Sequence, residues 1–147
     1  MLGGFTLLEL MVVVAILGSL SAIGIPTYRG YIEQAKITKA IADIRTIEKE
    51  ILTYLAVNGS LPDSLADINR ENFLDPWGNP YQFLNFANIQ GKGKKRKDRF
   101  LVPLNEDFDL YSMGKDGKSQ TPLTAKASHD DIVRADDGRY IGIASEY

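Results

Sequence analysis

Two acidic clusters, the first with one aspartate and the second with two, lie about a dozen residues apart in the C-terminal half of the chain. The first is Asp116, which two glycines bracket in Met113–Lys118, and the second is Asp130 and Asp131, which follow Ser128. Calcium in proteins takes roughly six to eight oxygen ligands from carboxylates and backbone carbonyls. Both clusters could share one such ion, which would offset the mutual repulsion of their carboxylates. By spacing alone, an Asp-rich turn exposed to water is the commoner alternative.

Another unusual carboxylate, Glu9, is the only charged residue in the apolar or small stretch Phe5–Ile25. A stretch of roughly 20 such residues is long enough to cross a bilayer as one helix. A lone carboxylate inside a bilayer costs about 2.5–3.5 kcal/mol, and such groups are kept where they find a partner. Glu9 is therefore a candidate functional residue.

Three interpretations of the stretch Phe5–Ile25 compete. A cleaved secretory signal has a shorter apolar core and a small-residue cleavage site after it, whereas Ile25-Pro26-Thr27-Tyr28 is a poor site. A plain membrane anchor has no use for Glu9. A segment that works both in the bilayer and in an assembly of subunits gives Glu9 a role, and we favour it.

Composition excludes several classes of function. The formal charge of −2 and the sequence pI near 5.4 argue against a general polyanion binder, so no nucleic acid partner is expected. The chain has no cysteine, which excludes disulfides and thiolate metal sites. A single histidine, His129, disfavours a Ser-His-Asp triad or a zinc site with several histidines. The 147 residues leave room for one modest domain after the apolar stretch.

After Pro26 the chain is expected to continue as a helix to about Val57, with one apolar face. Charged residues fill the other faces. The apolar residues recur at three- and four-residue spacings; they are Ile37, Ile41, Ile44, Ile47, Ile51, Tyr54 and Leu55. Asn58-Gly59 is a helix-stop signal. Residues 5–27 and 28–57 thus predict two halves of one rod of about 50 residues, or roughly 80 Å. The apolar half protrudes and the amphipathic half packs on a domain.

Residues 58–147 are expected to form that domain, a small antiparallel β-sheet, which makes the fold class α+β. Ser60–Ile68 predicts a loop into a short helix, with Leu65 and Ile68 packing inward. Short runs rich in β-branched and aromatic residues predict strands, at Tyr81–Leu84, Phe100–Val102, Phe108–Ser112 and within Asp137–Ala144.

The chain begins with a recognisable motif. It reads Gly3-Gly4-Phe5-Thr6-Leu7-Leu8-Glu9 and continues as the apolar stretch. This motif resembles the processing site of type IV pilins and of type II secretion pseudopilins. The resemblance implies that a prepilin peptidase removes residues 1–4 by cutting after Gly4 and then methylates Phe5. It also implies that Glu9 pairs with the Phe5 ammonium of a neighbouring subunit, so that each ion offsets the other's desolvation.

Two further motifs narrow the resemblance. Two prolines and a glycine in Asp75-Pro76-Trp77-Gly78-Asn79-Pro80-Tyr81 predict an ordered turn that Trp77 anchors to the core. This motif resembles the signature of the major pseudopilins of type II secretion, and the two acidic clusters resemble the calcium loop of these proteins. The resemblance implies a calcium ion bound by Met113 (through its carbonyl), Asp116, Ser128, Asp130 and Asp131, with Asp136 and Asp137 as alternatives.

A run of basic residues, Gly91–Arg99, departs from the pseudopilin pattern and is called the basic cluster below. It could bind phosphates, anionic lipid headgroups or an acidic partner. No aromatic residue is interleaved with it, so stacking on single-stranded bases is not indicated. A mobile hairpin tip between two strands is the simpler interpretation.

The resemblance implies a structural filament subunit, the major pseudopilin of a type II secretion system, and no enzymatic activity. Subunits would wait in the inner membrane of a Gram-negative bacterium with the domain in the periplasm. They would then join a helical homopolymer in the periplasm, together with minor pseudopilins and an inner-membrane assembly platform. A surface type IV pilin for adhesion, motility or nucleic-acid uptake is the alternative. A membrane-tethered enzyme, the third class, lacks a visible nucleophile–base pair.

Overall fold

The computed structural model describes residues 4–147, so residues 1–3 of the expected leader lie outside the described residues. The longest element is helix α1, Leu7–Asn58, which is 52 residues long and continuous through Pro26. Four strands follow: β1 (Gln82–Asn85), β2 (Phe108–Ser112), β3 (Ile132–Ala135) and β4 (Tyr140–Ile143). The chain divides into two compact units, of which the first ends at Ala35 and the second is Lys36–Tyr147.

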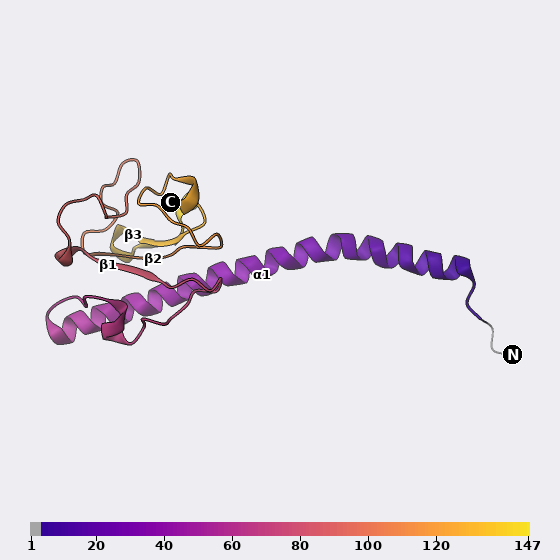
Figure 1. Cartoon of the computed structure of the whole chain (residues 1–147), viewed down its shortest axis with the longest axis horizontal. Helices are drawn as coiled ribbons and strands as arrows, with labels where there is room; N and C mark the ends of the chain where they lie inside the picture. The colour runs from indigo at the N-terminus through magenta and orange to yellow at the C-terminus, as the bar shows by residue number, and fades with distance from the viewer. Residues whose placement is uncertain (1–3) are drawn as a thin grey trace. The chain divides into compact units, whose positions relative to one another are not determined.

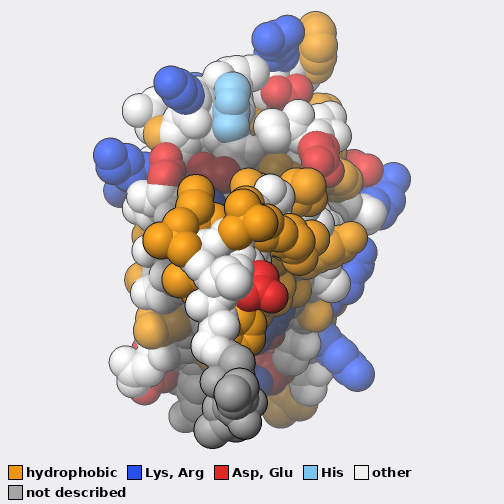
Figure 2. Space-filling model, turned by 90° about the vertical axis from the view of Figure 1, so that its right-hand side faces the viewer, with side chains coloured by type: hydrophobic (Ala, Val, Ile, Leu, Met, Phe, Trp, Pro, Cys, Tyr) orange, Lys and Arg blue, Asp and Glu red, His pale blue; other side chains and the backbone are white. Residues whose placement is uncertain are grey.

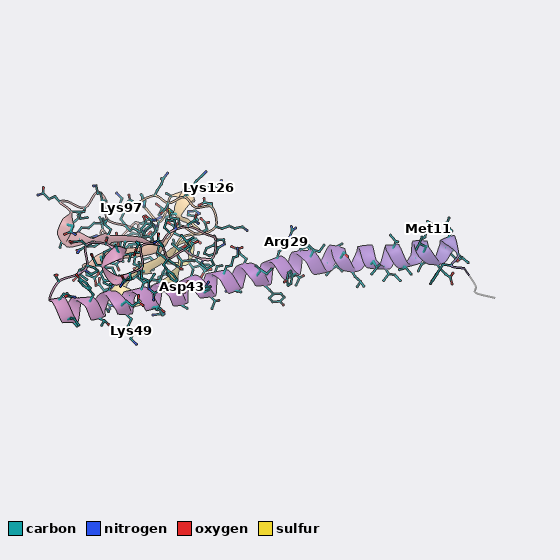
Figure 3. The ribbon with its side chains drawn as sticks, turned by 60° about the horizontal axis from the view of Figure 1, so that its bottom comes forward. Met11, Arg29, Asp43, Lys49, Lys97 and Lys126 are labelled. Atoms are coloured by element: carbon teal, nitrogen blue, oxygen red, sulfur yellow. The ribbon has the colours of Figure 1, made fainter. Side chains whose placement is uncertain are left out.

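The first unit consists of the N-terminal part of α1, and its large apolar side chains are exposed. Between Glu9 and Arg29 the sequence has no charged residue. Figure 2 shows hydrophobic side chains gathered on the face that it presents, and Figure 3 marks Met11 and Arg29 on this part of the helix. Helix α1 is long and apolar enough to cross a membrane. The expected apolar half of the helix is therefore present with its side chains uncovered.

The second unit contains a four-stranded antiparallel sheet in the order β1-β2-β3-β4. Figure 1 shows the sheet beside the C-terminal part of α1. The predicted α+β class is thus confirmed. The predicted strands at Tyr81–Leu84 and Phe108–Ser112 correspond to β1 and β2, and the predicted C-terminal strand corresponds to β4.

One hydrophobic core lies between α1 and the sheet. The helix buries the predicted stripe, with Ile44, Ile47 and Ile51 fully enclosed, against Phe108 of β2 and Ile132 of β3. The side chains that were expected to face inward, Leu65, Ile68 and Trp77, pack against the same cluster. Charged residues occupy the other helix faces, of which Figure 3 marks Asp43 and Lys49. Burial of this stripe is what binds the helix to the sheet.

A second, smaller cluster of buried residues packs with Tyr111 of β2 and Tyr140 of β4; its members are Leu104, Leu123, Val133, Ala135 and Ala144. Neighbouring residues of β3 divide between the two clusters, Ile132 in the first and Val133 in the second. Side chains of successive strand residues point to opposite faces. Both faces of β3 are therefore covered.

The structure corrects one predicted strand. Phe100–Val102 forms no strand, and Phe100 is 90% exposed. The surrounding chain makes a tight loop in which the Asp98 amide donates to the carbonyl of Leu101 (3.0 Å) and the Leu104 amide to that of Arg96 (2.9 Å). A backbone closed on itself in this way has no sheet edge to join. Strand β3, all of whose residues are buried, was not expected from the sequence.

A buried arginine adds a polar link between the helix and the sheet. Arg134 of β3 is 2% exposed by side chain, and its Nε donates to Glu48 of α1 at 2.6 Å. Its Nη1 and Nη2 donate to the two carboxylate oxygens of Asp107 at 2.8 and 3.0 Å. The guanidinium also lies over the ring of Phe108, 4.0 Å from its centroid. Arg134 thus fixes the sheet against a helix 86 residues away in sequence.

Candidate functional site

The predicted assembly residue, Glu9, belongs to a cap at the start of α1. Its Oε2 accepts hydrogen bonds from the backbone N–H of Thr6 (2.8 Å) and from the Thr6 hydroxyl (2.9 Å). The Thr6 hydroxyl in turn accepts from the Glu9 N–H at 3.2 Å. This reciprocal pair is a capping box, which satisfies amides that the first helical turn leaves without partners.

Glu9 lies four residues after Phe5 in the sequence, and Phe5 is 88% exposed. The two groups of Thr6 that donate to the Glu9 carboxylate are both neutral. An ion in apolar surroundings is costly unless an opposite charge accompanies it. The helix start therefore presents a fixed, exposed carboxylate whose negative charge the neutral donors of Thr6 do not balance.

The motif Asp75–Tyr81 forms the ordered turn that the sequence predicts. Asp75 Oδ1 accepts from the backbone N–H of Trp77 (3.0 Å) and of Asn79 (2.8 Å), and the Asp75 N–H donates to the carbonyl of Asn79 (2.8 Å). Gly78 takes a φ of 95°, a conformation that favours glycine. One carboxylate therefore organises the whole turn.

The same turn holds the start of the acidic loop, defined here as Met113–Asp131. Asp75 Oδ2 accepts from the hydroxyl of Ser112 at 2.6 Å, and Asn79 Nδ2 donates to the carbonyl of Gly114 at 2.8 Å. The motif that resembles the pseudopilin signature is thus in direct contact with the loop that resembles the calcium loop. The sequence did not indicate this contact, because the two stretches are 35 residues apart.

Two of the predicted ligands, Asp116 and Asp130, meet where the acidic loop closes on itself. Asp130 Oδ2 accepts from the backbone N–H of Asp116 at 2.9 Å, and Asp116 Oδ1 accepts from that of Lys118 at 2.7 Å. Gly114 has a φ of 63°, and a Cβ there would collide with the carbonyl and the side chain of Asp130. A glycine is therefore needed for this approach.

The other predicted side-chain ligands, Ser128 and Asp131, are buried and have different partners. Ser128 Oγ accepts from the backbone N–H of Gln120 (2.8 Å) and donates to its carbonyl (2.7 Å). Asp131 Oδ2 accepts from Arg96 and from the Ser119 hydroxyl, each at 2.6 Å. Burial raises the pKa of the Asp131 carboxyl, and the hydrogen bond from Ser119 and the charge of Arg96 oppose that effect.

The predicted acidic ligands are therefore divided between two places in the loop. Asp116 and Asp130 meet at one of them, and Asp131 turns away to Arg96 at the other. Among residues 4–147, no group of three or more histidine or acidic side chains is placed to hold a metal ion. The alternatives Asp136 and Asp137 lie elsewhere, because Asp136 pairs with Arg139 (3.3 Å) and Asp137 accepts from the N–H of Glu106 (2.8 Å). Calcium binding stays a prediction, and the donors fit it only in part.

Sequence reasoning missed the cation in this region, Arg96, because it treated the basic cluster as one solvated run. Arginine suits buried ion pairs better than lysine, but Arg99 of the same cluster is exposed, so residue type alone does not single out Arg96. Figure 3 shows Lys97 and Lys126 on the side of the second unit away from α1.

The helix on an antiparallel sheet, together with the N-terminal motif, defines a pilin-like filament subunit. Residues 3–25 match the model of the prokaryotic N-terminal methylation motif. The chain is 35% identical over 136 residues to the type II secretion system core protein G of Pseudomonas aeruginosa, covering 78% of this chain and 84% of the relative. It therefore belongs to the family of type II secretion system core protein G, the major pseudopilins.

One further relative agrees with this assignment, and another is a type IV fimbrial protein. The core protein G of Escherichia coli is 30% identical over 139 residues, covering 80% of this chain and 85% of the relative. The type IV major fimbrial protein FimA of Dichelobacter nodosus is 35% identical over 77 residues, which cover 52% of this chain and 48% of the relative. No solved structure matches the chain significantly.

Proposed function

We propose that this chain is the repeating subunit of a periplasmic pseudopilus that serves type II protein secretion. The observation that carries the proposal is its similarity to type II secretion system core protein G over about four fifths of its length. The apolar, uncovered N-terminal part of α1 supports it as well, because an apolar helix face outside a membrane needs other copies to cover it.

Assembly on this proposal begins with cleavage after Gly4 by a prepilin peptidase and methylation of Phe5. The subunit waits as a single-pass protein of the inner membrane, with its β domain in the periplasm. Glu9 then pairs with the Phe5 ammonium of a neighbouring subunit. The capping box supports this step, because it fixes the orientation of the carboxylate before a partner arrives. Minor pseudopilins and an inner-membrane platform are the further partners.

The experiment that tests the pairing uses Glu9→Gln in a Gram-negative strain that lacks its own major pseudopilin. Glutamine retains an oxygen that accepts from Thr6, so the cap survives while the charge is lost. We expect the variant to insert into the membrane as the wild type does and to form no filaments and support no secretion. Membrane fractionation, electron microscopy of sheared fibres and a secretion assay give the three readings.

Thr6→Ser is the matched control, since it keeps the hydroxyl of the cap and all charges. It should assemble normally. Filaments and secretion at wild-type level from Glu9→Gln would remove the pairing step. Long surface fibres at native expression, with no restoration of secretion, would favour the type IV pilin alternative, to which the partial similarity to FimA points.

The proposal includes a calcium ion bound where Asp116 and Asp130 meet in the acidic loop. The close approach of these two residues supports such a site. A bound ion would offset the repulsion of these carboxylates and stabilise the folded domain. Thermal unfolding of the chain with calcium and with excess chelator tests it: calcium should raise Tm in the wild type and not in Asp116→Asn. Equal Tm values in calcium and in chelator would remove calcium from the proposal.

A further inference from the structure

The basic cluster is not uniformly exposed. Lys92, Lys94 and Arg99 are exposed, whereas Arg96 is 3% exposed and turns into the domain. A buried guanidinium costs several kcal/mol in desolvation unless charges and hydrogen bonds compensate for it. The partners of Arg96 therefore reveal what this residue does.

The guanidinium of Arg96 reaches the C-terminal end of the acidic loop. Nη2 donates to Asp131 Oδ2 at 2.6 Å, and Nη1 donates to the hydroxyl of Ser119 at 2.6 Å. That hydroxyl donates to the same Asp131 oxygen at 2.6 Å. The guanidinium carbon also lies 4.1 Å from the centroid of the Tyr111 ring. Arg96, Ser119 and Asp131 thus form a closed triangle that spans the loop.

The backbone on either side of Arg96 is equally fixed. The Arg96 N–H donates to Asp109 Oδ2 at 2.7 Å, and the Arg96 carbonyl accepts from Leu104 at 2.9 Å. The next residue, Lys97, exchanges backbone hydrogen bonds with Thr121 (3.2 Å) and Leu123 (2.9 Å) of the acidic loop. Arg96 therefore lies in a segment whose backbone is held by hydrogen bonds, and not in the mobile hairpin tip that the sequence suggested.

Two buried side-chain atoms lack hydrogen-bond partners among the described residues, and both belong to this pair. They are Arg96 Nε and Asp131 Oδ1. An arginine can pair with a carboxylate through two parallel bonds, and one of those bonds is already made by Nη2 and Oδ2. The remaining donor and acceptor have complementary chemistry. Nε and Oδ1 are the donor and the acceptor that the second parallel bond of such a pair uses.

We propose that Arg96 is the resident cation of the acidic loop and takes, at Asp131, the place that the pseudopilin resemblance gives to calcium. Asp131 has no exposed surface and already has a full positive charge beside it. A covalently supplied guanidinium cannot dissociate or be chelated. This end of the loop therefore stays closed at any calcium concentration, and a metal ion is confined to the end at Asp116 and Asp130.

A double-mutant cycle on the full chain in detergent micelles, in excess chelator, tests this pairing. The variants are Arg96→Met, Asp131→Asn and their combination, with urea unfolding followed by fluorescence of Trp77, the only tryptophan. Each single change should lower the folding equilibrium constant roughly 100-fold or more. The double variant should lose about as much as one single change, because the two residues act as a pair. Additive losses would overturn the proposal.

Two control variants separate the buried ion pair from the general effect of losing a positive charge. Lys94→Met removes a charge from an exposed position of the same cluster and should leave the equilibrium constant unchanged. Arg96→Lys keeps the charge but loses the planar fork, so it should fold and lose roughly 10-fold. An unchanged equilibrium constant in Arg96→Lys and in Arg96→Met would also overturn the proposal.

Added calcium separates this inference from the calcium site of the proposed function. The Tm increase produced by calcium should be the same in Asp131→Asn as in the wild type, and it should vanish in Asp116→Asn. If calcium no longer raised the Tm of Asp131→Asn but still raised that of Arg96→Met, Asp131 would be a metal ligand. That result would overturn the inference. If the wild type does not respond to calcium, the metal site fails, and the cycle in chelator still decides the role of Arg96.

Discussion

The two carboxylates Glu9 and Asp131 stand in opposite situations. Glu9 lies in the exposed apolar part of α1 and accepts hydrogen bonds from the neutral groups of Thr6. Asp131 is enclosed in the β domain and accepts from Arg96, a cation that the same chain supplies. Asp131 thus has its counter-charge within the fold, whereas neutral donors hold the charge of Glu9 in place.

This difference separates folding from assembly. Removing one partner of an ion pair buried within a single chain leaves an unpaired charge and destabilises that chain, whereas an ion that must pair with another copy matters only when subunits meet. Changes in the β domain should therefore alter the free energy of unfolding, and the change at Glu9 should alter polymerisation alone. The following predictions test that separation.

The largest loss of stability is expected for Arg134→Met, which leaves Glu48 and Asp107 without their shared partner. Removing one member of a buried ion pair costs about 3–5 kcal/mol, and Arg134 also holds α1 to β3. Urea unfolding should show this loss, while the variant still inserts into membranes. Glu9→Gln is the comparison variant, and the midpoint of its urea unfolding should equal that of the wild type. A loss of stability in Glu9→Gln comparable with that in Arg134→Met would erase the distinction.

A smaller loss is expected for Gly114→Ala, which separates the two ends of the acidic loop. The left-handed φ of 63° and the collision of the new Cβ with Asp130 together cost about 2–4 kcal/mol. Gly59→Ala is the matched control, because Gly59 has a φ of 77° with open space around it and should lose only about 1 kcal/mol. Equal losses in the two variants, measured by urea unfolding, would mean that the contact with Asp130 carries no energy.

The sequence predicts those parts of the fold that depend on local periodicity. The stripe containing Ile44, Ile47 and Ile51 indicates both the helix and its buried face, and Asn58-Gly59 marks its end correctly. Strand β3 could not be found in this way, because Ile132–Ala135 is covered on both faces and shows no alternation. Phe100–Val102 has strand-forming residues but no sheet edge to pair with, which only the tertiary structure reveals.

The candidate sites divide along the same line. Glu9 lies within a local sequence motif, so the sequence singled it out together with the methylation motif, and its assembly role stays a prediction. The acidic loop depends on contacts between distant residues. Spacing suggested that Asp116, Asp130 and Asp131 converge, but adjacent residues can face different partners, as Asp130 and Asp131 do. No local pattern indicates that Arg96, 35 residues away, would be one of those partners.

The smallest effect is expected at a partly exposed ion pair, Glu50 of α1 with Arg70. Hydrogen bonding to Arg70 lowers the pKa of the Glu50 carboxyl. A lowered pKa in the folded state contributes stability above the ordinary pKa of glutamate, and that contribution is lost as pH falls through the folded value. Both side chains are about a third exposed, so the pair contributes only about 0.2–1 kcal/mol. Glu50→Gln should therefore lose this amount at pH 7 by urea unfolding, and the loss should shrink as pH falls through the folded pKa of Glu50. A loss at pH 7 as large as that of Arg134→Met would show that exposure does not rank the ion pairs of this domain.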